Sequence, residues 1–494
     1  MAEERFFKMS ENGSHEYCCT VVRVGELTPI EGSDFLMQTM VNGNSIVVSK
    51  DVKEGDIMIY AENETQLNEK FLCLNNLYEI GSRELNSNYH EVEKLLLEGK
   101  NDEAKKLCGF FNKHGRVKLI RLRGCPSLGF LFSIESMAKY NPMVNDINIE
   151  DYIGEDFDTV YDELFVKAYV PYVPPARGER RKSEKSQKKL ERFDRLVPGE
   201  FQLHYDTLPL QKNMVKIRPD DVVNISLKVH GSSGIFSNVK TRTPLKLPFY
   251  KKWFNKFVDS TGWFKDLRVT DHIIEYGSVY SSRKVIKNEY INKNLNGGFY
   301  NKDIWGDINE WIYPLLDEGM SVYGEIYGYV DEQGKLIQGG YDYGCKPGEK
   351  AFMPYRITTS LEDGRKYEWN VSDVLEWTRR MLKEHPELKG KLTEIPVFYH
   401  GKLKDLYPEV DVSNHWHDNV LEALRNDKER FGMEKDEPLC KNKVPREGIC
   451  IRIDNDPFNE CFKLKCYKFL KKEGEEISKG NVDMEMMENY SEEI

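Results

Sequence analysis

The sequence has no apolar run close to the roughly 20 residues that a helix needs to span a bilayer. It begins with MAEERFFKMSENGSHEY, which is polar and acidic and unlike a secretory or mitochondrial leader. We therefore expect a cytoplasmic protein that makes no contact with a membrane.

The signatures of several common enzyme and metal-binding classes are also missing. The 10 cysteines show no zinc-site spacing: Cys18 and Cys19 are adjacent, and Cys461 and Cys466 enclose four residues. Scattered thiols of this kind are typical of an intracellular, reducing compartment. Neither a P-loop nor a His-Glu-x-x-His pattern is present, which argues against a P-loop nucleotide hydrolase and a zinc protease.

Positive charge is in deficit, with 71 lysines and arginines against 82 acidic residues and a net charge of −11. This balance argues weakly against non-specific nucleic-acid binding, although the distribution of charge matters more than the sum. The basic residues gather in 176–195 (ARGERRKSEKSQKKLERFDR), which follows several prolines. We interpret 151–195 as a linker whose charges are solvated, and contact with phosphates is the alternative.

The first part of the chain is rich in short strands. Apolar runs alternate with turns over 17–60, a charged, helical insert covers about 85–110, and strands resume at 115–124 (GRVKLIRLRG) and 128–132. Short strands separated by glycine turns predict a small β-barrel, which we assign to a first domain over 1–150.

Three cations, Lys118, Arg121 and Arg123, lie on the strand predicted over 115–124. Small barrels hold nucleic acid with basic grooves and stacking. We therefore predict that these residues bind nucleic acid, although surface lysines and arginines usually do nothing specific.

The second half, 196–475, mixes strands and helices and ends before an acidic tail, 476–494. Its most informative stretch is ISLKVHG, in which Lys228 ends an apolar, strand-like run just before Gly231 and has no acidic neighbour. Further stretches that end or form strands follow in the order 280–284 (YSSRK), 322–328 (VYGEIYG), 446–452 (REGICIR) and 462–466 (FKLKC).

In this order the five stretches resemble motifs I, Ia, III, IV and V of the covalent nucleotidyltransferases, the superfamily of ATP-dependent ligases and mRNA capping enzymes. Each stretch alone is weak, because Lys-x-x-Gly occurs by chance in many proteins. The stretch 351–357 (AFMPYRI) resembles motif IIIa, whose aromatic residue stacks on adenine. Either Phe352 or Tyr355 fills that role, since Arg356 stands where ligases usually have an acid.

The chemistry of these residues agrees with the resemblance. A lysine amine attacks phosphorus only when it is neutral, and desolvation or nearby cations favour that form. Lys463 and Lys465 share one face of a strand because positions i and i+2 align. Near Lys228 they would disfavour its protonation and stabilise phosphate charge. The alternative is that they are strand-edge charges that prevent aggregation.

The resemblance assigns the remaining site residues. Glu447 is the expected ligand of Mg²⁺ or Mn²⁺, because magnesium prefers carboxylate oxygens. Glu325 is expected to accept a ribose hydroxyl, and Arg283 to contact phosphate or ribose; ordinary strand-edge acids are the alternative for both glutamates. The residues expected to surround the nucleotide after Lys228 are Val229, His230 and Gly231, of which the glycine allows a tight turn.

The order of the modules favours one branch of the superfamily. DNA ligases and capping enzymes carry an OB domain after motif V, whereas here motif V ends at Cys466 and the remaining tail is too short for a barrel. The first domain resembles the N-terminal OB domain of one RNA ligase group, and Lys-x-His-Gly resembles RNA ligases more than DNA ligases. The expected fold is therefore α+β: an OB-like barrel followed by a nucleotidyltransferase domain of antiparallel sheets with flanking helices.

The resemblance implies a monomeric, ATP-dependent RNA ligase that seals 3′-hydroxyl and 5′-phosphate ends, above all nicks in duplexes with RNA on the 3′-hydroxyl side. Lys228 would carry AMP, which then passes to the 5′-phosphate. Two other readings stay open. One is a DNA ligase or a capping-type guanylyltransferase, and the other is a non-catalytic nucleic-acid-binding protein on a ligase fold.

Overall fold

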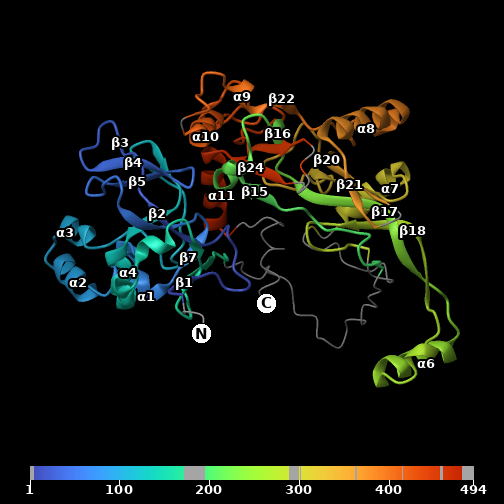
Figure 1. Ribbon diagram of the computed structural model, residues 1–494, viewed down its shortest axis with the longest axis horizontal. Coiled ribbons are helices and arrows are strands. Elements are labelled where there is room, and N and C mark those ends of the chain that lie inside the picture. The colour runs from blue at the N-terminus through green and yellow to red at the C-terminus, as the bar shows by residue number, and fades with distance from the viewer. Residues whose placement is uncertain are drawn as a thin grey trace.

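The computed structural model describes residues 5–171, 195–288, 300, 302–361, 364–413, 415–454, 456 and 460–480. The fold is mixed α+β with mainly antiparallel sheets, as predicted (Figure 1). Most of the predicted linker and most of the acidic tail lie outside the described residues. Within the ranges given, no helix is long and apolar enough to cross a membrane.

The first half of the chain forms several small sheets around a core rich in aromatic side chains. Its strands are β1 (Phe7–Lys8), β2 (Cys19–Arg23), β3 (Thr28–Pro29), β4 (Leu36–Val41), β5 (Asn44–Ser49), β6 (Ile57–Ala61), β7 (Thr65–Leu67), β8 (Ile120–Leu122), β9 (Cys125–Ser127), β10 (Phe130–Ser133), β11 (Asp156–Phe157), β12 (Thr159–Val160), β13 (Glu163–Leu164) and β14 (Val166–Ala168). The largest sheet has the order β10-β6-β2-β11, and β3-β4-β5 form another. The pairings of these described strands do not close into one barrel, and an OB-like form of this half stays a prediction.

Short helices join these strands: α1 (Glu69–Leu74), α2 (Tyr89–Leu97), α3 (Asn101–Lys106) and α4 (Ile134–Tyr140). Helices α2 and α3 confirm the helical insert predicted over 85–110. The cap of α1 shows why a helix begins there, because the Asn68 side chain accepts hydrogen bonds from the first free backbone N–H groups.

The strand predicted over 115–124 is wrong in its extent. Only β8 is a strand: Lys118 precedes it, and Arg123 lies in the turn before β9 with φ at 51°. The reason is a long-range contact. The backbone of Val117 bonds at 2.8 Å both to Glu64 and to Thr65, which ties the chain to the start of β7 before β8 begins.

The second half contains two five-stranded sheets. The first has the order β15 (Thr207–Pro209), β24 (Cys461–Lys465), β23 (Gly448–Ile453), β16 (Val222–Lys228) and β22 (Val397–Lys402). The second has the order β18 (His272–Ser281), β17 (Ser232–Pro244), β19 (Met320–Gly328), β20 (Lys350–Ser360) and β21 (Lys366–Glu368). A three-residue turn, 229–231, connects β16 of one sheet to β17 of the other.

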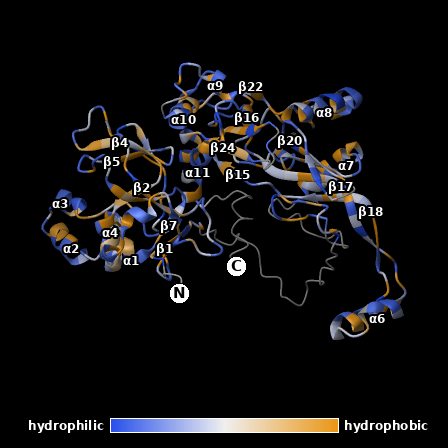
Figure 2. Ribbon diagram, viewed as in Figure 1, coloured by the Kyte–Doolittle hydropathy of each residue, from blue (hydrophilic) through white to orange (hydrophobic). Residues whose placement is uncertain are grey.

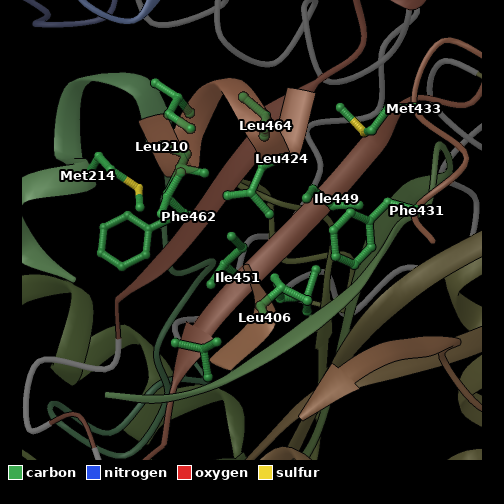
Figure 3. Close-up of a cluster of buried hydrophobic side chains, with 14 of the residues drawn as sticks. Leu210, Met214, Leu406, Leu424, Phe431, Met433, Ile449, Ile451, Phe462 and Leu464 are labelled. Atoms are coloured by element: carbon green, nitrogen blue, oxygen red, sulfur yellow. The ribbon is translucent and has the colours of Figure 1, made fainter. Parts of the chain in front are cut away.

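The helices of this half are α5 (Leu210–Asn213), α6 (Phe249–Thr261), α7 (Ile304–Ile312), α8 (Val371–Glu384), α9 (Leu403–Leu406), α10 (Trp416–Asn426) and α11 (Tyr467–Ser478). Figure 2 shows hydrophobic and hydrophilic residues along the same helix in α8, and its buried residues Val371, Val374 and Thr378 recur at helical spacing. Figure 3 shows the core of the first sheet, where Ile449, Ile451 and other apolar side chains gather.

Helix α11 was not expected from the sequence. It follows β24 directly and reaches Ser478, and it buries Phe469 and Ile477. Its short, charged sequence contains only a few apolar residues. The position of the helix therefore depends on tertiary packing and not on a local sequence pattern.

Candidate active site

One face of the first sheet borders a cavity of about 580 Å³. Successive side chains of a strand point to opposite faces. Ser226 and Lys228, two positions apart on β16, line the cavity, and so does the buried Leu227 between them. The residues of this sheet that line it are Thr207, Leu208 and Pro209 of β15, Asn224, Ser226, Leu227 and Lys228 of β16, Cys450 and Arg452 of β23, and Cys461, Lys463 and Lys465 of β24. The alternation thus brings all three lysines predicted from the sequence to one space.

The strand register determines the relative positions of Lys228 and Lys465. Lys228 pairs with Gly448, and Gly448 pairs in turn with Lys465. The middle position has no side chain, so no side chain of this row stands between the two lysines. A Cβ atom at Gly448 would lie 2.0 Å from the carbonyl oxygen of Leu464, which shows that only glycine fits there.

Glu447 precedes that glycine and lies among the cations. Its side chain is 3 % exposed, and its Oε1 atom is 2.7 Å from Lys228 Nζ and 3.9 Å from Lys465 Nζ. Its Oε2 atom is 3.4 Å from His230 Nδ1. Burial by itself would raise the pKa of Glu447, but Lys228, His230 and Lys465 together hold it well below its usual range. The carboxylate is therefore ionised at neutral pH.

The turn after Lys228 depends on close backbone contact. The backbone N–H of His230 donates to the Tyr343 hydroxyl at 2.8 Å. At Gly231 an added Cβ atom would lie 2.6 Å from the Ile326 carbonyl oxygen and 3.1 Å from Glu325 Oε2. Gly231 thereby allows the first sheet to approach β19 of the second, and with it Glu325.

The second sheet supplies the opposite side of the cavity. Glu325 of β19 and Tyr355 of β20 line it, together with Arg283 just after β18 and Val229 of the connecting turn. Arg283 follows β18, and its Nη2 atom lies 3.2 Å from the Asp206 carboxylate. The structure therefore brings residues from both sheets to one pocket.

The two candidates for a stacking aromatic residue have different surroundings. Phe352 is fully buried, and its ring meets that of Phe236 edge-on with centroids 5.0 Å apart. Tyr355 lines the cavity. The register of β20 shifts between Pro354 and Arg356, so Tyr355 is the extra residue of a bulge, and bulges redirect a side chain. Of the two, only Tyr355 is placed to meet a ligand.

His204 lines the same cavity and was missed by the sequence reasoning. Its Nδ1 atom lies 3.3 Å from the Ser233 hydroxyl. Burial, with the positive charges of Arg283 and Arg356, lowers the pKa of His204 well below its ordinary value, so the ring is neutral at pH 7. A single histidine outside any motif gives no sequence signal.

Two acidic partners of the lysines were also missed. Lys465 Nζ lies 2.9 Å from Glu473 of α11, and Lys463 Nζ lies 2.9 Å from Glu16 of the first half of the chain. Burial by itself would lower the pKa of Lys465, but Glu473 and Glu447 raise it above its ordinary value. Both halves of the chain thus contribute charge to the cavity.

A divalent metal would find one carboxylate here. The described part of the chain contains no group of three or more His, Cys, Asp or Glu side chains that could hold a metal ion. Magnesium commonly binds through one or two carboxylates together with substrate phosphates and water. The buried, ionised Glu447 fits that donor set.

The three cations assigned to nucleic acid lie apart from this cavity. Lys118 borders a second cavity of about 430 Å³ within the first half. Arg121 Nη2 is 3.7 Å from Glu434, and Arg123 is exposed in its turn. They do not share one strand, and their binding of nucleic acid stays a prediction.

Comparisons with known proteins identify the fold. No protein-family model matches the chain, and no curated protein matches it. Among solved structures it is similar to a mutant RNA ligase of Naegleria gruberi with AMP and Mn, at 15% identity and a TM-score of 0.50 over 92% of this chain and 98% of that one. It is similar also to an apo mutant of the same ligase, at 14% identity and a TM-score of 0.50 over the same shares, 92% and 98%. The chain therefore has the fold of an RNA ligase.

Proposed function

We propose that the protein is an ATP-dependent RNA ligase of the covalent nucleotidyltransferase superfamily, with Lys228 as its nucleophile. The observation that carries the proposal is the row Lys228, Gly448 and Lys465, with the ionised Glu447 beside it. The RNA ligase fold supports the same reading.

The first step is the transfer of AMP to Lys228. Its neutral amine attacks the α-phosphorus of ATP, a P–N bond forms, and the bond to pyrophosphate breaks as the amine loses a proton. Lys228 Nζ is 2.7 Å from Glu447 in the structure and must leave this carboxylate to attack. Lys463 and Lys465 face the same space and would stabilise the charge that develops on the phosphate.

Glu447 would hold Mg²⁺ or Mn²⁺ together with phosphate oxygens and water. When bound, the cation would supply Lewis-acid polarisation of the phosphate. Lys465 lies in the same strand row as Lys228, with Gly448 between them, and its positive charge would also disfavour protonation of the nucleophile once Lys228 has left Glu447.

The base and sugar of ATP would lie between the two sheets. Tyr355 would stack on adenine, which its place at the cavity supports, whereas the buried Phe352 does not line the cavity. Glu325 would accept a ribose hydroxyl, and Arg283 would contact phosphate or ribose. Val229 and His230, which precede Gly231 in the turn, would line the remaining part of the nucleotide pocket.

Two further steps would join the strands. AMP passes from Lys228 to the 5′-phosphate of the break, and a 3′-hydroxyl then attacks this phosphate and releases AMP. The preferred substrate is a nick with RNA on the 3′-hydroxyl side, since a 2′-hydroxyl and A-form geometry distinguish RNA from DNA. The OB-like first half would help to hold this nucleic acid, with the protein acting as a monomer.

The proposal is tested with labelled nucleotides and matched nicked duplexes. ATP with Mg²⁺ should label the protein covalently, whereas GTP should not, and nicks with RNA on the 3′-hydroxyl side should be sealed fastest. Labelling by GTP would instead indicate a capping-type guanylyltransferase, and equal sealing of all-DNA nicks would indicate a DNA ligase. Binding of nicks without any labelling or sealing would indicate a non-catalytic protein.

A further inference from the structure

Helix α6 stands away from both sheets. It lies between β17 and β18 and protrudes from the body of the protein at the far end of this strand pair (Figure 1). The strands remain paired up to Pro244, which precedes the helix, and His272, which follows it. Asn255 fixes the helix to the returning chain, because its side chain donates to the Val269 carbonyl at 2.8 Å and accepts from the Val269 N–H at 3.0 Å.

The helix presents aromatic side chains to solvent. Phe249 is 84 % exposed, Tyr250 67 %, Trp253 63 % and Phe257 39 %. Residues three and four positions apart share a helix face, so these four form one continuous strip, here called the aromatic stripe. The rings of Trp253 and Phe257 are stacked, with centroids 6.2 Å apart and planes at 17°. Exposed apolar patches of this kind mark interaction sites.

The charge around the stripe is positive. Residues 245–258 contain four lysines and no acidic residue, in a chain whose net charge is −11. Lys252 and Lys256 lie four positions apart and border the aromatic stripe, and neither makes an ion pair with the described residues. The nearest acid, Asp259, is bound by Arg268 at 2.9 Å. The surface is therefore suited to an anionic partner with flat, apolar groups.

We propose that α6 binds single-stranded nucleic acid, with bases stacked on the aromatic stripe and phosphates on Lys252 and Lys256. Rings interleaved with cations are how proteins bind single strands without sequence preference. Resting on the proposed function, the occupant is the RNA strand that runs from the break. Strand β17 links the two sites, because it begins beside Gly231 and leads toward α6.

The spacing of the two sites gives the proposal a length requirement. β17 has 13 residues, which span about 40 Å at about 3.3 Å per residue. A strand that stays base-stacked, with the rise of about 3.4 Å per nucleotide found in a duplex, needs about 12 nucleotides to span this length. At the same rise an oligonucleotide of about 6 nucleotides covers about 20 Å, or about half of the span.

The test measures binding of labelled single-stranded RNA to the full chain by fluorescence anisotropy. We compare RNA of about 24 and about 6 nucleotides, which are longer and shorter than the span. The variants are W253A/F257A for stacking and K252A/K256A for charge. The controls are Tyr367→Ala and Lys383→Ala, which remove an exposed aromatic ring and an exposed lysine from other elements. Melting temperatures confirm that all variants are folded.

For the longer RNA, W253A/F257A should weaken binding about tenfold or more. K252A/K256A should reduce the slope of log affinity against log salt concentration by about 1.4, for two lost phosphate contacts. Both controls should bind as the wild type does, and the ratio of long-RNA to short-RNA affinity should fall in both double variants.

Wild-type affinity for the longer RNA in both double variants overturns the inference, as does an equal loss in the controls. Sedimentation with anionic vesicles that depends on Trp253 and Phe257, with RNA binding unchanged, also overturns it and assigns the stripe to a membrane. Failure of the proposed function is recognised separately, because the wild-type protein would then acquire no covalent AMP whatever α6 binds.

Discussion

At the scale of single residues, strand alternation made much of the site predictable. Lys463 and Lys465 were expected on one strand face with Lys228 nearby, and the structure places all three at one cavity. The sequence left the choice between Phe352 and Tyr355 open, because it gives no sign of the β-bulge at Tyr355. It also gave no sign of Glu16 and Glu473, since their contacts with the lysines depend on tertiary packing.

The two aromatic residues can be separated by experiment. Tyr355→Ala should raise the KM for ATP in self-adenylation about tenfold or more, because it removes the ring that we propose stacks on adenine, and it should leave the melting temperature nearly unchanged. Phe352→Ala should instead lower the free energy of unfolding by about 3–5 kcal/mol, because it empties a buried site. Nucleotide titrations and urea unfolding of both variants check this. The opposite pattern would show that Phe352 is the stacking residue.

The ionised Glu447 predicts a dependence of stability on pH. Its pKa is depressed in the folded state, so its stabilisation is present above the unfolded value of about 4.3 and is lost as the pH falls below it. Glu447→Gln should lower the free energy of unfolding by about 3 kcal/mol at neutral pH. The gap in melting temperature between the two proteins should then stay constant above about pH 5 and shrink as the pH falls from about 4.3 toward about 3. A constant gap across this range would contradict the account.

At the scale of elements, regular patterns were predictable and their interruptions were not. The charged, helical insert over 85–110 was predicted and contains α2 and α3. The strand predicted over 115–124 was too long. The backbone of Val117 is hydrogen-bonded to Glu64 and Thr65, which are distant in the sequence, and the regular strand begins only after this contact. Helix α11 was absent from the prediction. Its buried residues are Phe469 and Ile477, and two apolar residues eight positions apart do not by themselves indicate a helix.

The contact between β23 and β24 gives a prediction for Gly448. Gly448→Ala would place a Cβ atom 2.0 Å from the Leu464 carbonyl oxygen, so the two strands must separate. The free energy of unfolding should fall by about 1–3 kcal/mol or more, and self-adenylation should fall with it, since Lys465 moves away from Lys228. Gly25→Ala is the matched control, because no atom lies within 4 Å of its Cβ position. An active, stable Gly448→Ala protein would show that the row of lysines is not needed.

At the scale of the whole molecule, the two halves are joined by buried polar contacts. Lys212 Nζ lies 2.8 Å from Glu62, and their side chains are only 14 % and 9 % exposed. Arg116 donates to the Gly474 carbonyl of α11 at 3.2 Å and to Ser478 at 3.0 Å. These pairs lie far apart in the sequence, so no local pattern predicts them, and the docking of the halves could not be read from the sequence.

The buried pair predicts that the halves depend on each other. Lys212→Met would leave Glu62 buried without its cation, at a cost of about 3–5 kcal/mol. The control is Lys216→Met, because Lys216 pairs with Glu460 at the surface, where its side chain is 43 % exposed, and such pairs contribute about 0–1 kcal/mol. Urea unfolding and limited proteolysis compare the two variants. Equal stability of both would show that the halves dock without this pair.

The central claim is that the cavity is a nucleotide site with Lys228 as its nucleophile. The most direct test is peptide mapping by mass spectrometry after incubation with ATP and Mg²⁺. The account predicts AMP on Lys228 in the wild type and no covalent AMP in Lys228→Ala. Lys228→Arg should also acquire none, because a guanidinium is not deprotonated in proteins. AMP on another residue, or undiminished labelling of Lys228→Ala, would contradict the account.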